Sequence, residues 1–191
     1  MGLTNLVINN EGSNSKFEKT NMPLEDHLNK ILKRYFDIFL ASVFIFLLLP
    51  LLLLISIIIK LTSKGQVLFI QDRVTANNKI FKMYKFRTMK TGAENKTGPV
   101  LASERDERCT FFGYYLRRLS FDELPQLINV LKGDMSIVGP RPERPFFIDI
   151  FKNEITDYLE RHCVKAGITG WAQIHGLRGK TSIEKRVLYD L

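Results

Sequence analysis

With 191 residues, the chain is long enough for one domain with a hydrophobic core and a membrane element. Its formal net charge of +8 favours anionic partners, which include nucleic acid, anionic lipid headgroups and phosphorylated substrates. Cys109 and Cys163 form no CxxC pair and the three histidines lack metal-ligand spacing, so the sequence argues against a disulfide framework and a zinc site.

The N-terminal part divides into a polar leader and a hydrophobic helix. Residues 1–25 are rich in Asn, Ser, Lys and Glu, lack the apolar core of a secretory signal, and predict a flexible leader. Residues 26–60 form the predicted membrane-associated unit, in which Asp26 to Asp37 reads as a short amphipathic helix. We expect a membrane helix to follow it.

The predicted membrane helix is an apolar run from Ile38 to Ile59, which has 22 residues without a charge. This length suffices to span about 30 Å of hydrocarbon. Pro50 lies near its middle, where the missing backbone donor predicts a bend. Basic residues flank the run on both sides, with eight against one acid between Lys60 and Lys90. A bent helix that enters and leaves the cytoplasmic leaflet satisfies both flanks, whereas a Pro-kinked spanning helix, the open alternative, satisfies one.

Residues 61–191 form the predicted catalytic domain, and the whole chain is expected to be an α+β fold, mainly helical with a small β-element. Strands are expected at 67–70 and 80–86 around a turn at 76–78, followed by a polar loop over 91–106. Helices are expected at 111–119, at 123–131 with a glycine C-cap, and at 146–161. A glycine-rich stretch covers 167–179.

The adjacent acids Asp122 and Glu123 admit two interpretations. Ser120 with Glu123 matches a capping box, but that helix start puts Pro125 at an unfavourable fifth position. Asp122 as the N-cap puts Pro125 at the third position, where no backbone donor is needed. A carboxylate at the positive end of a helix also suits a nucleophile or a magnesium ligand, so both a structural and a chemical role stay open.

Arginines near this pair point towards phosphate chemistry. Arg141 lies between Pro140 and Pro142, which fix the backbone on both sides of the guanidinium. Arginine binds phosphate oxygens in a two-pronged geometry, and phosphoryl transfer needs fixed positive charge around those oxygens, usually with Mg²⁺. Arg117, Arg141 and Arg178 are therefore candidate phosphate-binding residues.

Several segments together resemble one protein family, and they are KRYFD (33–37), the Pro-centred apolar run, YKFRTM (84–89), LRRLSFDELPQLINVLKGDMSIVGPRP (116–142) and KAGITGWAQIHGLRG (165–179). The chain thereby resembles the bacterial sugar transferases, or monotopic phosphoglycosyl transferases, over residues 30–191. The resemblance implies a re-entrant helix in the bacterial inner membrane and a catalytic domain on its cytoplasmic face. It also implies transfer of a sugar 1-phosphate from a UDP-sugar to polyprenyl (undecaprenyl) phosphate, with release of UMP, at the start of exopolysaccharide, capsule, O-antigen or glycoprotein glycan synthesis.

The resemblance also assigns roles to individual residues. Asp122 matches the aspartate that forms a phosphosugar intermediate and lies beside the family's Mg²⁺, and Glu123 matches the second member of the acidic dyad. Arg117 and Arg141 match phosphate-contacting arginines. Lys85 matches the basic residue of the strand motif, and Pro50 matches the helix-breaking proline.

Two departures from the family pattern concern the membrane helix and the chain ends. Leu49 stands where the family often has serine before the breaking proline. Family members continue with an aromatic-rich tail beyond the position of Leu191, so we expect a C-terminally truncated catalytic domain, and the leader resembles the remnant of a preceding domain.

Two other classes of function are alternatives to the enzyme. A non-catalytic membrane-bound scaffold would hold anionic lipid or polysaccharide-assembly partners through its basic face. Nucleic-acid binding is disfavoured, because the basic residues adjoin an apolar membrane segment and no nucleic-acid motif is present.

Overall fold

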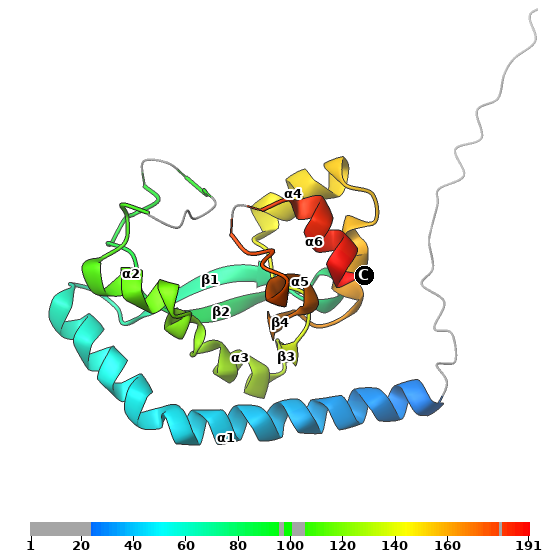
Figure 1. Ribbon diagram of the computed structural model, residues 1–191, viewed down its shortest axis with the longest axis horizontal. Helices are drawn as coiled ribbons and strands as arrows, with labels where there is room; N and C mark the ends of the chain where they lie inside the picture. The colour runs from blue at the N-terminus through cyan, green and yellow to red at the C-terminus, as the bar shows by residue number, and fades with distance from the viewer. Residues whose placement is uncertain (1–23, 96–97, 101–105, 180) are drawn as a thin grey trace, which may run out of the picture.

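The computed structural model describes residues 24–95, 98–100, 106–179 and 181–191. Figure 1 shows a long helix lying along a smaller globular part that contains short helices and two small sheets. This confirms the mixed helical and sheet character expected from the sequence. The predicted leader, residues 1–25, falls almost entirely outside the described residues.

The helices and strands of the described chain show no internal repeat. In chain order they are α1 (Leu24–Thr62), β1 (Leu68–Val74), η1 (Ala76–Asn78), β2 (Ile80–Phe86), α2 (Phe111–Arg118), η2 (Phe121–Glu123), α3 (Gln126–Lys132), β3 (Ser136–Val138), α4 (Pro145–Glu154), η3 (Tyr158–Cys163), β4 (Gly167–Thr169), α5 (Trp171–Ile174) and α6 (Ile183–Asp190), where η denotes a 3₁₀ helix.

The predicted amphipathic helix and the apolar run form one continuous helix, α1, of 39 residues. The expected boundary at Asp37 was wrong, because no glycine or proline interrupts the chain between residues 24 and 49. Pro50 lies inside α1, and Figure 1 shows the helix changing direction along its length. A proline that already has a helical φ removes one donor and bends the helix without ending it.

The apolar surface of α1 faces mainly outwards. By length and composition α1 could cross a membrane, and only 11% of its apolar window is buried against the rest of the described chain. The apolar run of a soluble core helix would be mostly covered by protein. The exposed leucines, isoleucines and phenylalanines of α1 therefore need another apolar environment.

Polar contacts fasten the first half of α1 to the globular part. The buried Asp37 carboxylate accepts hydrogen bonds from Ser136 Oγ at 3.1 Å and from the Ile137 amide at 3.0 Å. Arg34 donates to two carbonyls in the last turn of α3, at 2.6 and 2.9 Å. Carbonyls in the last turn of a helix lack the usual partner four residues further on, so Arg34 adds to the C-cap that the Gly133 amide forms at Val130 O.

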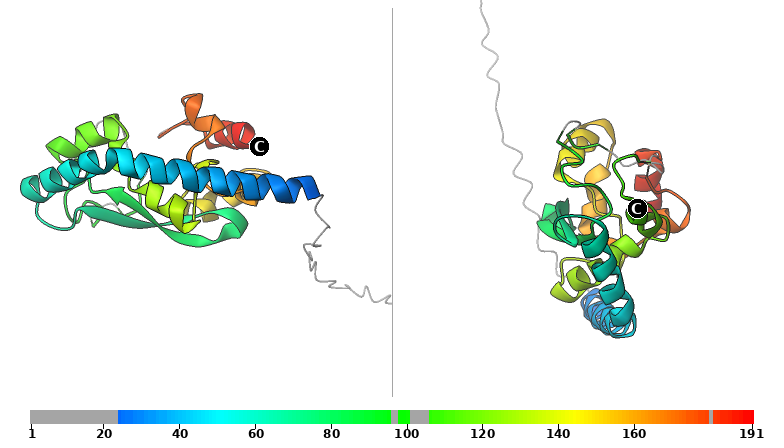
Figure 2. Two further views of the ribbon diagram at one scale, coloured as in Figure 1. Left: turned by 90° about the horizontal axis from the view of Figure 1, so that it is seen from below. Right: turned by 90° about the vertical axis from the view of Figure 1, so that its left-hand side faces the viewer.

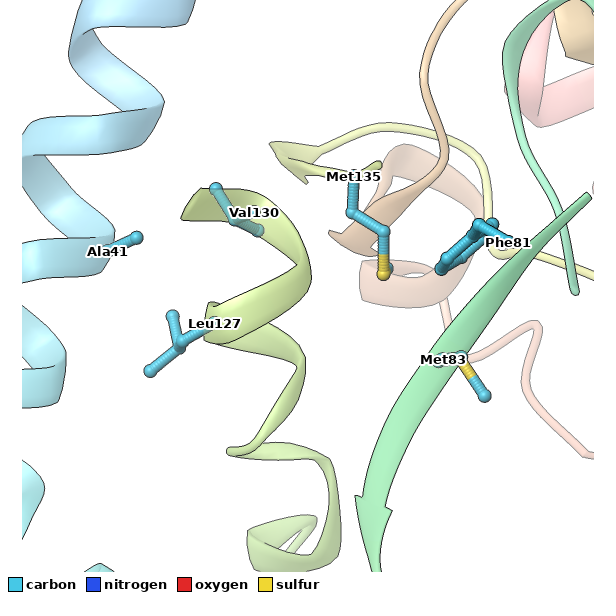
Figure 3. Close-up of a cluster of buried hydrophobic side chains, with 6 residues drawn as sticks. All are labelled: Ala41, Phe81, Met83, Leu127, Val130 and Met135. Atoms are coloured by element: carbon cyan, nitrogen blue, oxygen red, sulfur yellow. The ribbon is translucent and has the colours of Figure 1, made fainter. Parts of the chain in front are cut away.

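Three hydrophobic clusters hold the elements together. The first joins α1, β2 and α3, as Figure 3 shows, and consists of Ala41, Phe81, Met83, Leu127, Val130 and Met135. The second packs the later half of α1 against β2 and α2, through Ile55, Ile59, Phe86 and Leu116. The third joins β1, α4, η3 and α6, through Val74, Ile148, Tyr158 and Val187. Both halves of α1 thus pack on the same globular part, along which α1 extends in Figure 2.

The predicted hairpin is confirmed. Strands β1 and β2 pair antiparallel from Leu68↔Phe86 to Val74↔Ile80. The turn between them holds Asn77 and Asn78 at positive φ, a conformation that asparagine tolerates. A second sheet, in which β3 and β4 run parallel, was not predicted, since three-residue strands carry no periodicity.

Two predicted helices differ from the structure. The helix expected at 123–131 begins at Gln126, with Pro125 as its N-cap, and ends as expected at Gly133, which has φ 89°. The helix expected at 146–161 ends at Glu154, because Ile155 is extended, and Asp157 then adopts φ 59° before η3 begins. Side-chain packing of Tyr158 into the third cluster holds this break.

Candidate active site

The candidate site is centred on the short η2 turn between α2 and α3. Ser120 has φ 58°, so the chain reverses there, and Asp122 and Glu123 follow within η2. The capping interpretation fails for α3, because this helix starts only after Pro125. Ser120 is the N-cap residue of η2 instead, and its side chain makes no capping hydrogen bond. The carboxylate of Asp122 is therefore not engaged in helix capping.

Glu123 is held by two cations from distant parts of the chain. Lys85 Nζ, from β2, lies 3.0 Å from Glu123 Oε1. Arg141, from the loop after β3, donates Nη2 to Oε1 at 2.6 Å and Nη1 to Oε2 at 3.1 Å. These positive charges and hydrogen bonds outweigh burial and hold the pKa of Glu123 well below its usual range.

Asp122 lies next to this ion pair but differs from Glu123 in its hydrogen bonding and in the direction of its pKa shift. Its side chain is almost buried, at 8% exposure, and no described residue donates a hydrogen bond to its carboxylate. Burial raises the pKa of Asp122 to about 6, against the lowering effect of Lys85, and Glu123 adds to the rise. The charges of Arg117 and Arg141 act in the opposite direction. Asp122 is thus ionised near neutral pH but poorly solvated.

The pKa values of the two cations in the cluster shift in opposite directions. Burial lowers the pKa of Lys85, although Glu123 opposes this shift. The neighbouring charge of Glu123 raises the pKa of Arg141, so its guanidinium stays charged. Arg141 Nη1 also reaches Gln173 Oε1 at 3.4 Å, which connects the cluster to α5.

The structure brings together most, but not all, of the predicted site residues. Asp122, Glu123, Lys85 and Arg141 form one cluster. Arg117 lies at its flank, close enough for its charge to act on Asp122, and donates to Cys109 Sγ at 3.2 Å. Arg178 is exposed, and none of its side-chain contacts within the described residues reaches this cluster. Pro50 lies inside α1, outside this cluster.

Sequence reasoning missed two residues at the edge of this cluster. Arg73 of β1 donates to Pro142 O at 3.1 Å and lies 3.5 Å from Glu143. Gln173 of α5 is buried beside Arg141. Arg73 lies beyond the strand expected at 67–70, because β1 extends to Val74, so only the fold reveals its place. Gln173 lies within the glycine-rich stretch 167–179, and this stretch is the feature of the sequence that could have indicated it.

Asp122 is the residue that fits a magnesium ion. Among the described residues, no three or more His, Cys, Asp or Glu side chains gather around a common metal position. Mg²⁺ at phosphoryl-transfer sites is held by one or two carboxylates together with substrate phosphates and water. The Asp122 oxygens accept no hydrogen bond from described residues, whereas those of Glu123 are taken by Arg141 and Lys85. The donor set therefore suits an ion shared with a phosphorylated substrate.

Comparison with known proteins decides the family. A family model described as bacterial sugar transferase matches residues 28–191. The chain belongs to the bacterial sugar transferase family. The match starts inside α1 and runs through α6, so the shared region includes most of the long apolar helix and the whole acidic cluster.

Curated relatives agree with this assignment. The chain is 48% identical over 168 residues to the UDP-glucose:undecaprenyl-phosphate glucose-1-phosphate transferase of Escherichia coli (strain K12), a match covering 86% of this chain and 36% of that protein. It is 48% identical over 130 residues to the putative undecaprenyl-phosphate N-acetylgalactosaminyl 1-phosphate transferase of Bacillus subtilis (strain 168), covering 68% and 72%.

A third relative is the exopolysaccharide production protein PSS of Rhizobium leguminosarum bv. phaseoli, 43% identical over 157 residues, covering 81% of this chain and 78% of that protein. The lengths of the relatives differ widely. This bacterial sugar transferase spans about a third of the first relative and over two thirds of the other two.

Proposed function

We propose that this chain is a membrane-bound phosphoglycosyl transferase that moves a sugar 1-phosphate from a UDP-sugar to undecaprenyl phosphate and releases UMP. The names of the relatives support the reaction type, since those from Escherichia coli and Bacillus subtilis are undecaprenyl-phosphate sugar 1-phosphate transferases. The name of the Rhizobium protein supports a place in exopolysaccharide production.

The observation that carries the proposal is the unequal state of two adjacent carboxylates. Glu123 is locked by Lys85 and Arg141, whereas Asp122 is buried, free of hydrogen-bond donors among the described residues, and ionised near neutral pH. A carboxylate without hydrogen-bond donors keeps its electron pairs available, so Asp122 suits attack on phosphorus. The locked Glu123 holds two positive charges beside it.

The chemistry proceeds in two balanced steps. An Asp122 oxygen attacks the phosphorus that bears the sugar, the bond from that phosphorus to the bridging oxygen breaks, and UMP leaves with this oxygen and its electron pair. An oxygen of undecaprenyl phosphate then attacks the same phosphorus, and the bond to Asp122 breaks. The carboxylate is restored, and no proton is gained or lost by it.

The surrounding residues stabilise the charge that develops on the phosphoryl oxygens. Arg141 and Lys85 hold positive charge in a partly buried site, where charges act more strongly than in water. Arg117 adds a third positive charge at the flank. When bound at Asp122, Mg²⁺ would neutralise the phosphates of the donor.

The helix α1 is proposed to enter and leave the cytoplasmic leaflet of the inner membrane. Asp37 ties the first half of α1 to β3, while Ile55 and Ile59 pack the second half against β2 and α2. A helix that crossed the bilayer would keep only one of its ends on the side of the globular domain. Contact of both halves with the same domain therefore supports a re-entrant helix, which would place Asp122 at the membrane surface.

The test is donor-dependent release of UMP. Purified protein in nanodiscs is incubated with undecaprenyl phosphate, Mg²⁺ and a panel of UDP-sugars, and UMP is quantified. Asp122→Asn should reduce release by at least about 1,000-fold. Asp149→Asn, an exposed carboxylate paired with Lys152, is the matched control and should retain activity. Absence of UMP with every donor would contradict the proposal and favour a lipid-binding scaffold.

A further inference from the structure

In the loop that carries Arg141, four consecutive backbone carbonyls accept hydrogen bonds. In the four-residue segment 140–143, Pro140 O accepts from Gly167 N at 2.9 Å, Arg141 O from Arg161 Nη2 at 3.3 Å, Pro142 O from Arg73 Nη1 at 3.1 Å, and Glu143 O from Val74 N at 3.1 Å. The two central carbonyls thus depend on side chains, whereas the outer two depend on backbone amides.

Arg161 is held in place by the last helix. It is buried to 2% exposure. Its Nε donates a hydrogen bond to Asp190 Oδ2 of α6 at 2.9 Å, and its Nη2 forms an ion pair with the same oxygen at 2.7 Å. Its guanidinium also lies over the ring of Tyr158, 5.4 Å from the centroid. These contacts fix the orientation of the guanidinium, in which Nη2 donates to Arg141 O.

Arg73 is held from the opposite side. Its Nη2 donates to Gln71 Oε1 at 2.8 Å, and Glu143 Oε2 lies 3.5 Å from its Nη1. Glu143 is itself buried and paired with Arg186 of α6 at 3.1 Å. Neither Arg73 nor Arg161 contacts Asp122 or Glu123 through a hydrogen bond within the described residues.

This arrangement supplies what the two prolines cannot. The rings of Pro140 and Pro142 fix their own φ angles but leave the following peptide planes free to rotate. Hydrogen bonds to the carbonyls of Arg141 and Pro142 fix the peptide planes that follow these two residues, and the bond from Gly167 N to Pro140 O fixes the plane before Arg141. The direction of the Arg141 side chain then follows from the backbone.

We propose that Arg161 and Arg73 are positioning residues that aim the Arg141 guanidinium at the transferring phosphoryl group by clamping the main chain on either side of it. The inference rests on the proposed function, because it assumes that Arg141 meets the phosphoryl group. Burying a charged side chain costs desolvation energy. Both Arg73 and Arg161 nevertheless donate hydrogen bonds to the loop that carries Arg141.

The experiment is a double-mutant cycle with Arg141. Arg161→Lys keeps a cation beside Asp190 but removes the hydrogen bond to Arg141 O. Arg73→Lys keeps a cation beside Glu143 but removes the hydrogen bond to Pro142 O. Each single variant should lower kcat by about 100-fold, the effect of a displacement of about 1 Å in a catalytic group, with a smaller change in KM for the UDP-sugar. In an Arg141→Ala background, the same changes should alter kcat by no more than about twofold.

The matched control is Arg87→Lys. Arg87 also uses its guanidinium to hold carbonyls, those of Lys64 at 2.7 Å and Ser63 at 2.9 Å, but at the end of α1. Its effect on kcat should multiply with that of Arg141→Ala. If the effect of Arg161→Lys also multiplies with that of Arg141→Ala, the positioning role is wrong. Asp190→Asn, which keeps Arg161 but weakens its partner, should follow the Arg161 pattern with a smaller loss.

Hydrogen exchange gives a readout that is independent of turnover. Amides in the peptide spanning residues 138–148 should exchange faster in Arg161→Lys than in the wild type, and at the wild-type rate in Arg87→Lys. Unchanged exchange in Arg161→Lys would overturn the inference. Faster exchange in a protein that releases no UMP from any donor would uphold the clamp on the loop and contradict the proposed function instead.

Discussion

Arg141 donates hydrogen bonds to Glu123 from both of its terminal nitrogens, at 2.6 and 3.1 Å. The adjacent Asp122 receives no hydrogen bond from the described residues. The pKa of Glu123 is held well below its usual range, whereas burial raises that of Asp122 to about 6. Two neighbouring carboxylates on one short turn therefore have different tasks. In the proposed mechanism Glu123 holds the two cations in place, and Asp122 is the group that reacts.

This division predicts opposite effects on stability. Glu123→Gln leaves the buried charges of Lys85 and Arg141 without their partner, so we expect a loss of about 3 kcal/mol in the free energy of unfolding. Asp122→Asn removes a buried charge that has no hydrogen-bond donor among the described residues, so we expect no loss and a gain of up to about 2 kcal/mol. Denaturant unfolding in detergent with EDTA measures both.

The same unfolding measurement can contradict the division of roles. EDTA excludes a contribution from bound metal to the stability of the wild type. The control variant is Asp149→Asn, whose exposed partner Lys152 makes it nearly neutral. Equal destabilisation by Glu123→Gln and Asp122→Asn would show that both carboxylates serve the fold.

Stability should also fall at mildly acidic pH because of His162. Burial lowers the pKa of His162 to about 4, and Asn78 Oδ1 lies 2.5 Å from its Nδ1. Between pH 6.5 and pH 4 the unfolded chain binds this proton and the folded chain does not. The histidine contribution is therefore fully present above pH 6.5 and is lost as pH falls towards 4, by up to about 1 kcal/mol per pH unit. Thermal unfolding across this range measures the slope.

Replacement of His162 isolates its share of that slope. His162→Gln keeps a polar side chain near Asn78 but cannot take up a proton. The variant should therefore show a shallower decline between pH 6.5 and pH 4 than the wild type. An identical decline in both proteins would assign the pH dependence to other groups.

The second sheet should not tolerate a side chain at Gly167. A Cβ there would lie 2.1 Å from the amide nitrogen of Gly139 and 2.5 Å from its carbonyl oxygen, so the strand β4 could not approach β3. Gly167→Ala should cost more than about 3 kcal/mol and reduce transferase activity, because Gly167 N also holds Pro140 O. Unfolding and UMP release measure the two effects.

Gly176 provides the comparison. A Cβ at Gly176 would meet no heavy atom within 4 Å, but its φ of 77° disfavours alanine. Gly176→Ala should therefore cost only about 1 kcal/mol through backbone strain. A similar cost for Gly167→Ala and Gly176→Ala would show that close approach is not what requires glycine at Gly167.

The sequence was most informative where chemistry and periodicity are local. The uncharged run of α1, the hairpin and its asparagine turn, and the glycine end of α3 follow from short-range rules. The helix start near Asp122 was misjudged, because a left-handed Ser120 and tertiary contacts of Glu123 override a capping pattern. No local rule could place Arg73 or Arg161 behind Arg141, since that depends on how β1, η3 and α6 meet.

The bend in α1 should decide its path in the membrane. Replacing Pro50 with leucine restores the missing donor and favours a straight helix, which would carry the N-terminal flank across the bilayer. Single cysteines are introduced at Glu25 and, as a control in the globular domain, at Lys152, in a background without native cysteines. An impermeant maleimide applied to intact spheroplasts reports which side each cysteine faces.

The re-entrant path predicts that neither cysteine is labelled until the spheroplasts are permeabilised. In the Pro50→Leu variant, the cysteine at Glu25 should become labelled from outside while the cysteine at Lys152 stays protected. Labelling of the cysteine at Glu25 from outside in the parent protein would show that α1 crosses the membrane.

The proposed mechanism requires that Asp122 becomes covalently attached to the phosphosugar, which mass spectrometry can detect. The protein is incubated with a UDP-sugar and Mg²⁺ in the absence of undecaprenyl phosphate, quenched and digested. We predict that the peptide containing Asp122 gains the mass of the sugar phosphate, that Asp122→Asn shows no such gain, and that added undecaprenyl phosphate removes the adduct. UMP release by the wild type with the peptide unmodified, or with the adduct on another residue, would contradict the account.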